Sequence, residues 1–206
     1  RSEPEQYLGQ SVHASLTERG RSDAQALAER LRGVQIDRLV SSPLGRAVET
    51  SEILMVGRTE TLELHKDERL TELDYGLWEG ELLEDIMVKY PGEYDDYDAD
   101  PSQHHVGGGE NGSQVAVRVQ SLIEDLLAWQ EAEGGDRTCV LVGHSSVNRV
   151  LLAVVMGVPL IDYRRRFQQD WVNLTVLRWS SRESGPLMLL ANDVAHLRGL
   201  EGVTWD

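Results

Sequence analysis

The residue with the clearest chemical potential is His144. It follows the apolar run Cys139–Val142 and leads into the helical pattern Val150–Met156, so its imidazole is expected at the carboxyl end of a buried strand, beside a helix N-terminus. Open α/β sheets bind anions at that edge. His144 is therefore a candidate for binding or protonating an anion, although a single histidine in such a place is more often a packing or capping residue.

Two charged residues lie next to predicted turns. Arg46 comes after a Ser-Ser-Pro turn, in the first turn of a predicted helix, where the helix dipole disfavours a cation unless an anion is shared. The spacing alone is also consistent with an ordinary surface arginine. Glu72 precedes the aromatic, glycine-rich turn Tyr75–Gly80. Desolvation there would raise the carboxyl pKa and suit a general acid, with a solvated loop carboxylate as the alternative.

Helical and strand patterns alternate along the chain. Helices are expected after the cap Thr17 and until about Gly33, and over 46–55, 82–90 and 115–129; strands are expected over 36–42, 62–64 and 139–144. The tail runs 171–179 and 187–191 are predicted to pair, whereas 91–112 is expected to be a surface excursion without a strand. This alternation predicts an α/β fold: a three-layer sandwich with a mostly parallel central sheet and helices on both faces.

Composition narrows the possible partners. The 206 residues suit one domain, 1–206, and the formal net charge of −15 opposes binding to nucleic acid or to anionic membrane surfaces. The single cysteine, Cys139, cannot form an internal disulfide and is expected in a core strand, which suits a reducing cytoplasm. The pair His104-His105 lies near several aspartates, but adjacent histidines lack metal-binding helical spacing. We therefore expect a solvated acidic loop and no metal.

The three candidate residues belong to a longer series of motifs in a fixed order. The series is Leu16-Thr17-Glu18-Arg19-Gly20, Ser42-Pro43-Leu44-Gly45-Arg46-Ala47 with Thr50, Glu72 with Gly76-Leu77-Trp78-Glu79-Gly80, Gly109-Glu110 with Arg118, Gly143-His144-Ser145-Ser146-Val147-Asn148-Arg149, and Asn192-Asp193-Val194-Ala195-His196-Leu197. In this order and spacing, the segments resemble the histidine phosphatase superfamily, which has the phosphoglycerate-mutase-like fold, and especially its small phosphatase branch.

The resemblance places the family's nucleophile outside the numbered chain. That nucleophile is the histidine of an Arg-His-Gly triplet at the end of the first strand, followed by any residue and then Ser or Thr. Arg1-Ser2-Glu3 looks like the sequence after this triplet, so the strand and triplet are expected upstream of residue 1. His13 lies in a polar loop with no strand before it and is not expected to replace the nucleophile.

The resemblance also assigns the remaining site. It implies catalytic roles for Glu72 and His144, with His144 cationic when phosphate is bound. The implied substrate-binding residues are Arg46, Ser2, Gln6, Ser145 and Asn148. Glu5 stands where many members carry a phosphate-binding asparagine, and Gln6 beside it is the expected substitute, while Asn148 has the alternative of being a polar helix residue. No cofactor is implied.

The leading functional hypothesis is a phosphatase that hydrolyses small phosphomonoesters through a phosphohistidine intermediate. Phosphoglycerate mutase-type transfer is a second hypothesis, and a non-catalytic phosphate-binding relative is a third, if the protein begins near Arg1. The expected partner is a small phosphorylated metabolite, and a homodimer is possible. The sequence does not select the phosphomonoester; candidate specificity residues lie in 94–109 and around Tyr7 and Trp78.

Overall fold

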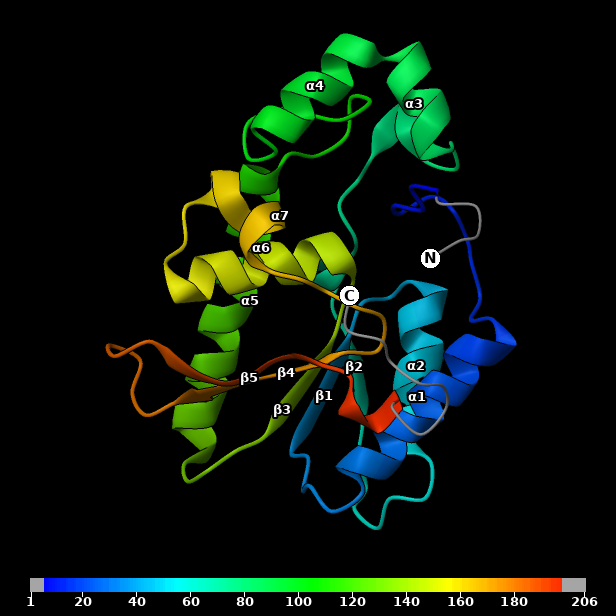
Figure 1. Ribbon diagram of the computed structural model, residues 1–206. Helices are drawn as coiled ribbons and strands as arrows, with labels where there is room; N and C mark the ends of the chain where they lie inside the picture. The colour runs from blue at the N-terminus through cyan, green and yellow to red at the C-terminus, as the bar shows by residue number, and fades with distance from the viewer. Residues whose placement is uncertain (1–5, 198–206) are drawn as a thin grey trace.

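A parallel sheet forms the centre of the computed structural model, which describes residues 6–197 (Figure 1). Its strand order is β2-β1-β3, with β1 over Arg38–Ser41, β2 over Leu64–Lys66 and β3 over Cys139–Val142. The register pairs Ser41 with Val142 on one side and with Lys66 on the other. The carboxyl ends of the three strands therefore meet at one edge, as the sequence predicted.

Helices cover both faces of this sheet (Figure 1). α1 (Glu18–Leu31) and α2 (Gly45–Met55) lie on one side, and α5 (Gly112–Glu133) and α6 (Ser145–Met156) lie on the other. β3 serves both layers because its side chains alternate in direction. Val140 and Val142 pack with the core of α1 and α2, whereas Cys139 and Leu141 pack with Leu122 of α5. The predicted α/β sandwich is confirmed.

Side-chain caps fix where two helices begin. The Thr17 hydroxyl accepts a hydrogen bond from the Gly20 amide at 3.0 Å, as expected for the start of α1. Asn111 and Gln114 form a reciprocal capping box at the start of α5. α5 therefore begins at Gly112, three residues before the predicted start at 115. The prediction began at the first apolar residue of the pattern, whereas the capping box ends the preceding loop earlier.

A cap of two helices rises above the carboxyl edge of the sheet (Figure 1). α3 spans Leu83–Lys89 and α4 spans Pro91–Ala99. The absence of a strand in 91–112 was predicted correctly, but the helix in its first half was missed. α4 places a single fully buried ring in the core, that of Tyr97. The Arg164 guanidinium of α7 (Tyr163–Arg166) lies 4.7 Å from the centroid of this ring. One anchoring side chain produces no apolar periodicity.

The tail forms a separate antiparallel hairpin. β4 (Leu174–Trp179) pairs with β5 (Pro186–Asp193), which confirms the predicted pairing, but the hairpin does not join the ladder of the central sheet within residues 6–197. The predicted strand over 62–64 was displaced, because the parallel register with β1 engages Leu64–Lys66. Within the same described residues, no helix has the length and apolar character needed to cross a membrane.

Candidate active site

His144 lies at the carboxyl end of β3 and occupies the N-cap position of α6. The neighbouring strand β1 delivers Ser42 beside it, since the Ser42 amide donates to the Val142 carbonyl at 2.9 Å. The Nε2 atom of His144 lies 2.8 Å from the fully buried Ser42 hydroxyl. The parallel register thus orients the imidazole by a hydrogen bond to one of its two ring nitrogens.

The imidazole of His144 is neutral in this arrangement. Burial lowers its pKa to about 3, and the positive charges of Arg46 and Arg118 act in the same direction. A neighbouring anion would oppose both cations and favour the protonated ring. The predicted cationic state with phosphate bound therefore requires the anion, and stays a prediction.

Glu72 is buried against the N-terminus of α6. Its Oε1 atom accepts hydrogen bonds from the amides of Leu73 at 2.9 Å, Ser146 at 3.1 Å and Val147 at 3.1 Å. Burial raises the carboxyl pKa, although these amides and the charge of Arg46 pull it in the opposite direction. The desolvated carboxyl expected from the aromatic turn is present, with α6 as an additional partner that the sequence did not reveal.

Glu72 occupies the N-terminus of α6. The amides of Ser146 and Val147, which follow His144, donate to its carboxyl group. A helix N-terminus attracts any anionic group, and the carboxylate occupies that position. The amides of α6 therefore lower the pKa of Glu72 and partly offset the effect of burial.

Arg46 reaches the same region from the first turn of α2. Its Nη2 atom donates to the Gly9 carbonyl at 2.7 Å. Burial lowers its pKa, and the charges of Glu72 and Glu79 oppose this effect. Because Arg46 acts electrostatically on both Glu72 and His144, the structure brings all three predicted side chains into one electrostatic neighbourhood.

The remaining predicted binding residues have different settings. Ser145 is exposed at the start of α6, while the Asn148 side chain folds back so closely that its Oδ1 would lie 2.4 Å from a Cβ on Gly143. Gln6 forms an isolated bridge with Leu82 in the cap. Ser2 lies outside the described residues. Their roles in substrate binding stay predictions.

The site also contains residues that sequence reasoning did not assign to it. The Gln10 side chain donates to the Glu72 carbonyl at 2.8 Å, and the main-chain N–H of Gln10 donates to the Glu79 carboxylate at 2.8 Å. Glu110 and Arg118 form an ion pair at 2.9 Å beside the same carbonyl. The last two belong to a motif that the sequence displayed, but their contacts depend on the packing of α5 against the Glu72 loop.

The histidine pair in the excursion has a structural environment. His105 Nδ1 lies 2.8 Å from the Gly109 carbonyl, and His104 and His105 are both exposed. Among residues 6–197, no three histidine, cysteine, aspartate or glutamate side chains gather as metal ligands would. The aspartates 95, 96 and 98 lie on α4, so this acidic segment is helical and not the expected loop.

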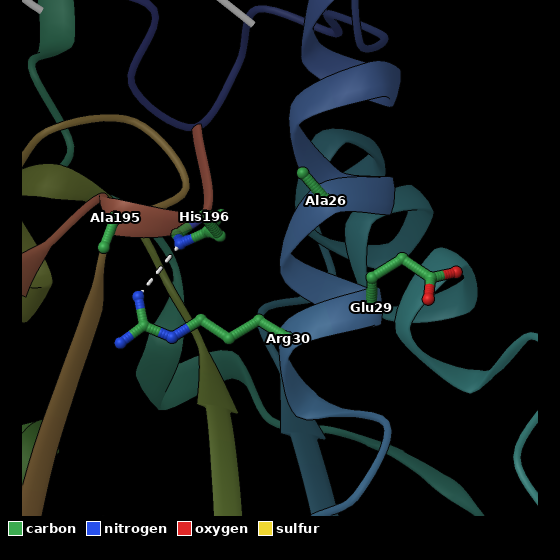
Figure 2. A pocket seen from close by; sticks show the side chains of 5 residues that line it. All are labelled: Ala26, Glu29, Arg30, Ala195 and His196. Carbon is green, nitrogen blue, oxygen red and sulfur yellow. Dashed lines mark hydrogen bonds between the residues drawn. The ribbon is translucent and has the colours of Figure 1, made fainter. Parts of the chain in front are cut away.

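A hollow lies away from this region, between α1 and the turn Ala195–Leu197 (Figure 2). It has a volume of about 480 Å³, and Arg30 crosses beside it to contact His196 at 3.3 Å and Asp193 at 2.5 Å. His196 also lies 2.9 Å from the Val172 carbonyl through Nε2. The closing motif Asn192–Leu197 therefore fastens the tail hairpin to α1.

Comparison with known proteins identifies the family of this chain. The family model described as "Histidine phosphatase superfamily (branch 1)" matches residues 2–193. The chain belongs to the histidine phosphatase superfamily. Phosphoserine phosphatase 1 of Hydrogenobacter thermophilus is 30% identical to this chain over 182 residues, which cover 88% of this chain and 82% of the relative.

Other superfamily members extend the comparison. A probable phosphoglycerate mutase, GpmB of Enterobacter sp., is 28% identical over 194 residues, covering 92% of this chain and 86% of its own. The structure of mycobacterial glucosyl-3-phosphoglycerate phosphatase in complex with inorganic phosphate aligns with a TM-score of 0.82 at 29% identity, covering 93% of both chains. The recognised family and its phosphoglycerate-mutase-like fold are thus confirmed.

Proposed function

We propose that the protein hydrolyses small phosphomonoesters through a phosphohistidine intermediate. The observation that carries the proposal is the buried carboxyl of Glu72, which accepts hydrogen bonds from the first amides of α6, the helix whose N-cap residue is His144. The charge of Arg46 acts on both residues. Relatives named as phosphatases, one of them solved with inorganic phosphate, support the proposal. The substrate would be a small phosphorylated metabolite.

Arg46 and His144 would bind the phosphoryl group. Phosphoryl transfer depends mainly on positioning and on stabilising charge on the equatorial oxygens. The guanidinium offers several N–H donors for these oxygens. His144 offers the ring nitrogen that Ser42 does not hold, and gains a proton as the anion offsets the charges of Arg46 and Arg118.

Glu72 would serve first as acid and then as base. Its Oε1 accepts the three short amide hydrogen bonds, whereas Oε2 has one at 3.3 Å from Ser146. The proton of the neutral acid therefore belongs on Oε2. As the histidine nitrogen bonds to phosphorus and the ester P–O bond breaks, this proton passes to the leaving oxygen. Water then gives a proton back to Glu72 as it attacks phosphorus and the P–N bond breaks.

The nucleophilic histidine would belong to a strand upstream of residue 1. The match of Arg1-Ser2-Glu3 to the sequence after the family's triplet supports this placement. A second support is the outer edge of β3, which has no ladder partner within residues 6–197, although His144 lies at its end. A strand paired there would end beside His144 and Ser42.

A phosphoglycerate mutase is the second candidate, and the similarity to a probable GpmB mutase favours it. A mutase keeps its phosphohistidine from water and returns the group to a second oxygen. A non-catalytic phosphate-binding relative is the third candidate. The buried acid Glu72 argues for catalysis, since binding of phosphate alone requires no proton donor at the ester oxygen.

One assay separates the three candidates. The full-length protein is incubated with a panel of phosphomonoesters, including phosphoserine, and separately with 3-phosphoglycerate and its bisphosphate. We expect release of inorganic phosphate from at least one ester. Isomerisation of phosphoglycerate would establish the mutase instead, and binding without either reaction would establish the non-catalytic relative.

The proposal also covers the partners, the cellular compartment and the oligomeric state of the protein. A net charge of −15 opposes nucleic acid and anionic membrane surfaces as partners. A single cysteine, Cys139, whose pKa burial raises to about 12, suits a reducing cytoplasm. A homodimer stays a prediction that light scattering on the purified protein would test.

A further inference from the structure

We propose that Arg118 is a positioning residue that fixes the acid Glu72 through its main chain. The inference rests on the proposed function, because it gives Arg118 a role in the protonation of the leaving group. Arg118 projects from α5, and Glu72 lies in the loop that follows β2 and the turn Glu68–Leu70.

Arg118 donates three hydrogen bonds to the backbone of this loop. Its Nη1 atom donates to the carbonyls of Arg69 at 2.7 Å and Thr71 at 2.8 Å, and its Nη2 atom donates to the Glu72 carbonyl at 3.3 Å. Three carbonyls in a span of four residues thus converge on one guanidinium. A rigid planar group with several donors is suited to this task, whereas a lysine ammonium is not.

Glu110 forms an ion pair with Arg118 and also accepts a hydrogen bond from the part of the loop that follows Glu72. Its carboxylate accepts from Arg118 Nε at 3.1 Å and Nη2 at 2.9 Å, and from the Asp74 amide at 3.1 Å. The Gln10 side chain bridges the Glu72 carbonyl and Glu110, at 2.8 and 3.3 Å. The backbone is therefore fixed immediately before and after Glu72.

Arg118, Glu110 and Gln10 form a clamp on the backbone around Glu72, which determines where its carboxyl group lies. Glu72 must reach the amides of Ser146 and Val147 on α6 while it presents Oε2 to the leaving oxygen. A displacement of about 1 Å in a catalytic group costs roughly 10²-fold in rate. Arg118 is partly buried, with 16% of its side chain exposed, and does not need to touch the substrate to have this effect. Its charge also favours the neutral His144, so the clamp serves both groups.

The test is a double-mutant cycle between Arg118→Met and Glu72→Gln in the full-length protein. Turnover is measured on p-nitrophenyl phosphate, whose leaving group needs little protonation, and on an alkyl phosphate that needs an acid. We expect Arg118→Met to lower kcat on the alkyl ester by roughly 10²-fold, to lower it far less on the aryl ester, and to cause no further loss in the Glu72→Gln background. Equal losses on both esters, or full additivity with Glu72→Gln, would overturn the proposal.

Arg58→Met is the matched control for lost packing and lost ion pairing. The Arg58 side chain is also buried, pairs with Glu60 at 2.5 Å and donates to the Leu31 carbonyl at 3.3 Å, outside the site. This variant is expected to lower stability without changing the ratio of aryl to alkyl turnover. Arg118→Lys keeps the charge and is expected to restore only part of the alkyl activity.

A spectroscopic arm keeps the proposal testable if activity is absent. The amide protons of Ser146 and Val147 report on the Glu72 carboxylate through NMR chemical shift and hydrogen exchange. We expect both to shift and to lose protection in Arg118→Lys and Arg118→Met, but not in Arg58→Met. Unchanged amides in the Arg118 variants would overturn the positioning role. A wild-type protein without phosphatase activity would refute the proposed function alone.

Discussion

At the residue scale, two shifts in proton affinity define the site. Burial raises the pKa of Glu72, and burial with two arginines lowers the pKa of His144. A carboxyl group with a raised pKa and an imidazole with a lowered pKa suit the binding and cleavage of a dianionic ester. The residue types were readable from the sequence, but the contact of Glu72 with Ser146 spans 74 residues and arises only when the chain folds.

Removal of either phosphate-binding side chain is expected to disable catalysis. Arg46→Ala and His144→Ala are each predicted to lower kcat by about 10²–10³-fold, the usual cost of one charge-stabilising donor. His13→Ala, at an exposed histidine outside the site, is the control and should retain its turnover. Steady-state kinetics with circular dichroism checks the result. A variant at 46 or 144 with full activity would remove that residue from the site.

Glu72→Gln tests the acid by the identity of the leaving group. Glutamine keeps an acceptor for the α6 amides but cannot transfer a proton. We expect a loss of about 10²–10⁴-fold for alkyl phosphates and a much smaller loss for p-nitrophenyl phosphate. Rates across a series of leaving-group pKa values measure this dependence, and an unchanged slope would argue against the acid role.

The depressed pKa of His144 predicts how stability depends on pH. Its folded value of about 3 lies below the usual 6.5, so the unfolded chain binds a proton more readily. The contribution of the neutral imidazole to stability is complete above about pH 6.5 and is lost as the pH falls towards 3. Urea unfolding at pH 7.5 and 4.5 should show a smaller pH dependence for His144→Gln than for the wild type. Equal dependence would indicate an ordinary pKa.

At the element scale, the sequence predicted best those elements whose ends are set locally. The Thr17 cap fixed α1, and the junction of β3 with α6 followed from an apolar run and a Gly-His turn. α4 was missed because a fully buried Tyr97 replaces an apolar stripe. β2 was displaced because its ladder with β1, and not its own composition, selects the paired residues.

The loop that carries Glu72 is packed against the excursion through glycines. Gly76 has φ +52°, and a Cβ there would lie 2.1 Å from the Gly107 carbonyl oxygen. Gly108 has φ +78° but nothing within 4 Å. Gly108→Ala is expected to cost about 1 kcal/mol of unfolding free energy from backbone strain, and Gly76→Ala about 1–3 kcal/mol more from the clash. Chemical denaturation of both variants measures this difference, and equal costs would show that the loop relaxes freely.

At the scale of the whole molecule, the cap and the sheet layers share one core. Trp78, Tyr97 and Val106 from the upper part pack in the same cluster as Val119 of α5 and Val150 of α6. The order of motifs along the sequence was sufficient to predict the family and the layered fold. It did not predict the separation of the β4–β5 hairpin from the sheet, because strand patterns do not specify which edges pair.

A shared core predicts one cooperative unfolding transition for the proposed single domain, 1–206. Near-ultraviolet circular dichroism reports on the aromatic cap, and far-ultraviolet circular dichroism reports on the helices. We expect both signals to change at the same denaturant concentration. A cap signal lost before the helical signal would indicate that the cap unfolds independently and would contradict the single domain.

The most direct test of the central claim is a crystal structure of the full-length protein with orthovanadate, which resembles a phosphoryl group in transfer. The account predicts that the vanadate oxygens lie within hydrogen-bonding distance of the Arg46 guanidinium and the His144 imidazole, with the Glu72 carboxyl at the leaving-group position. Vanadate bound elsewhere, or bound without Arg46 and His144, would contradict the account.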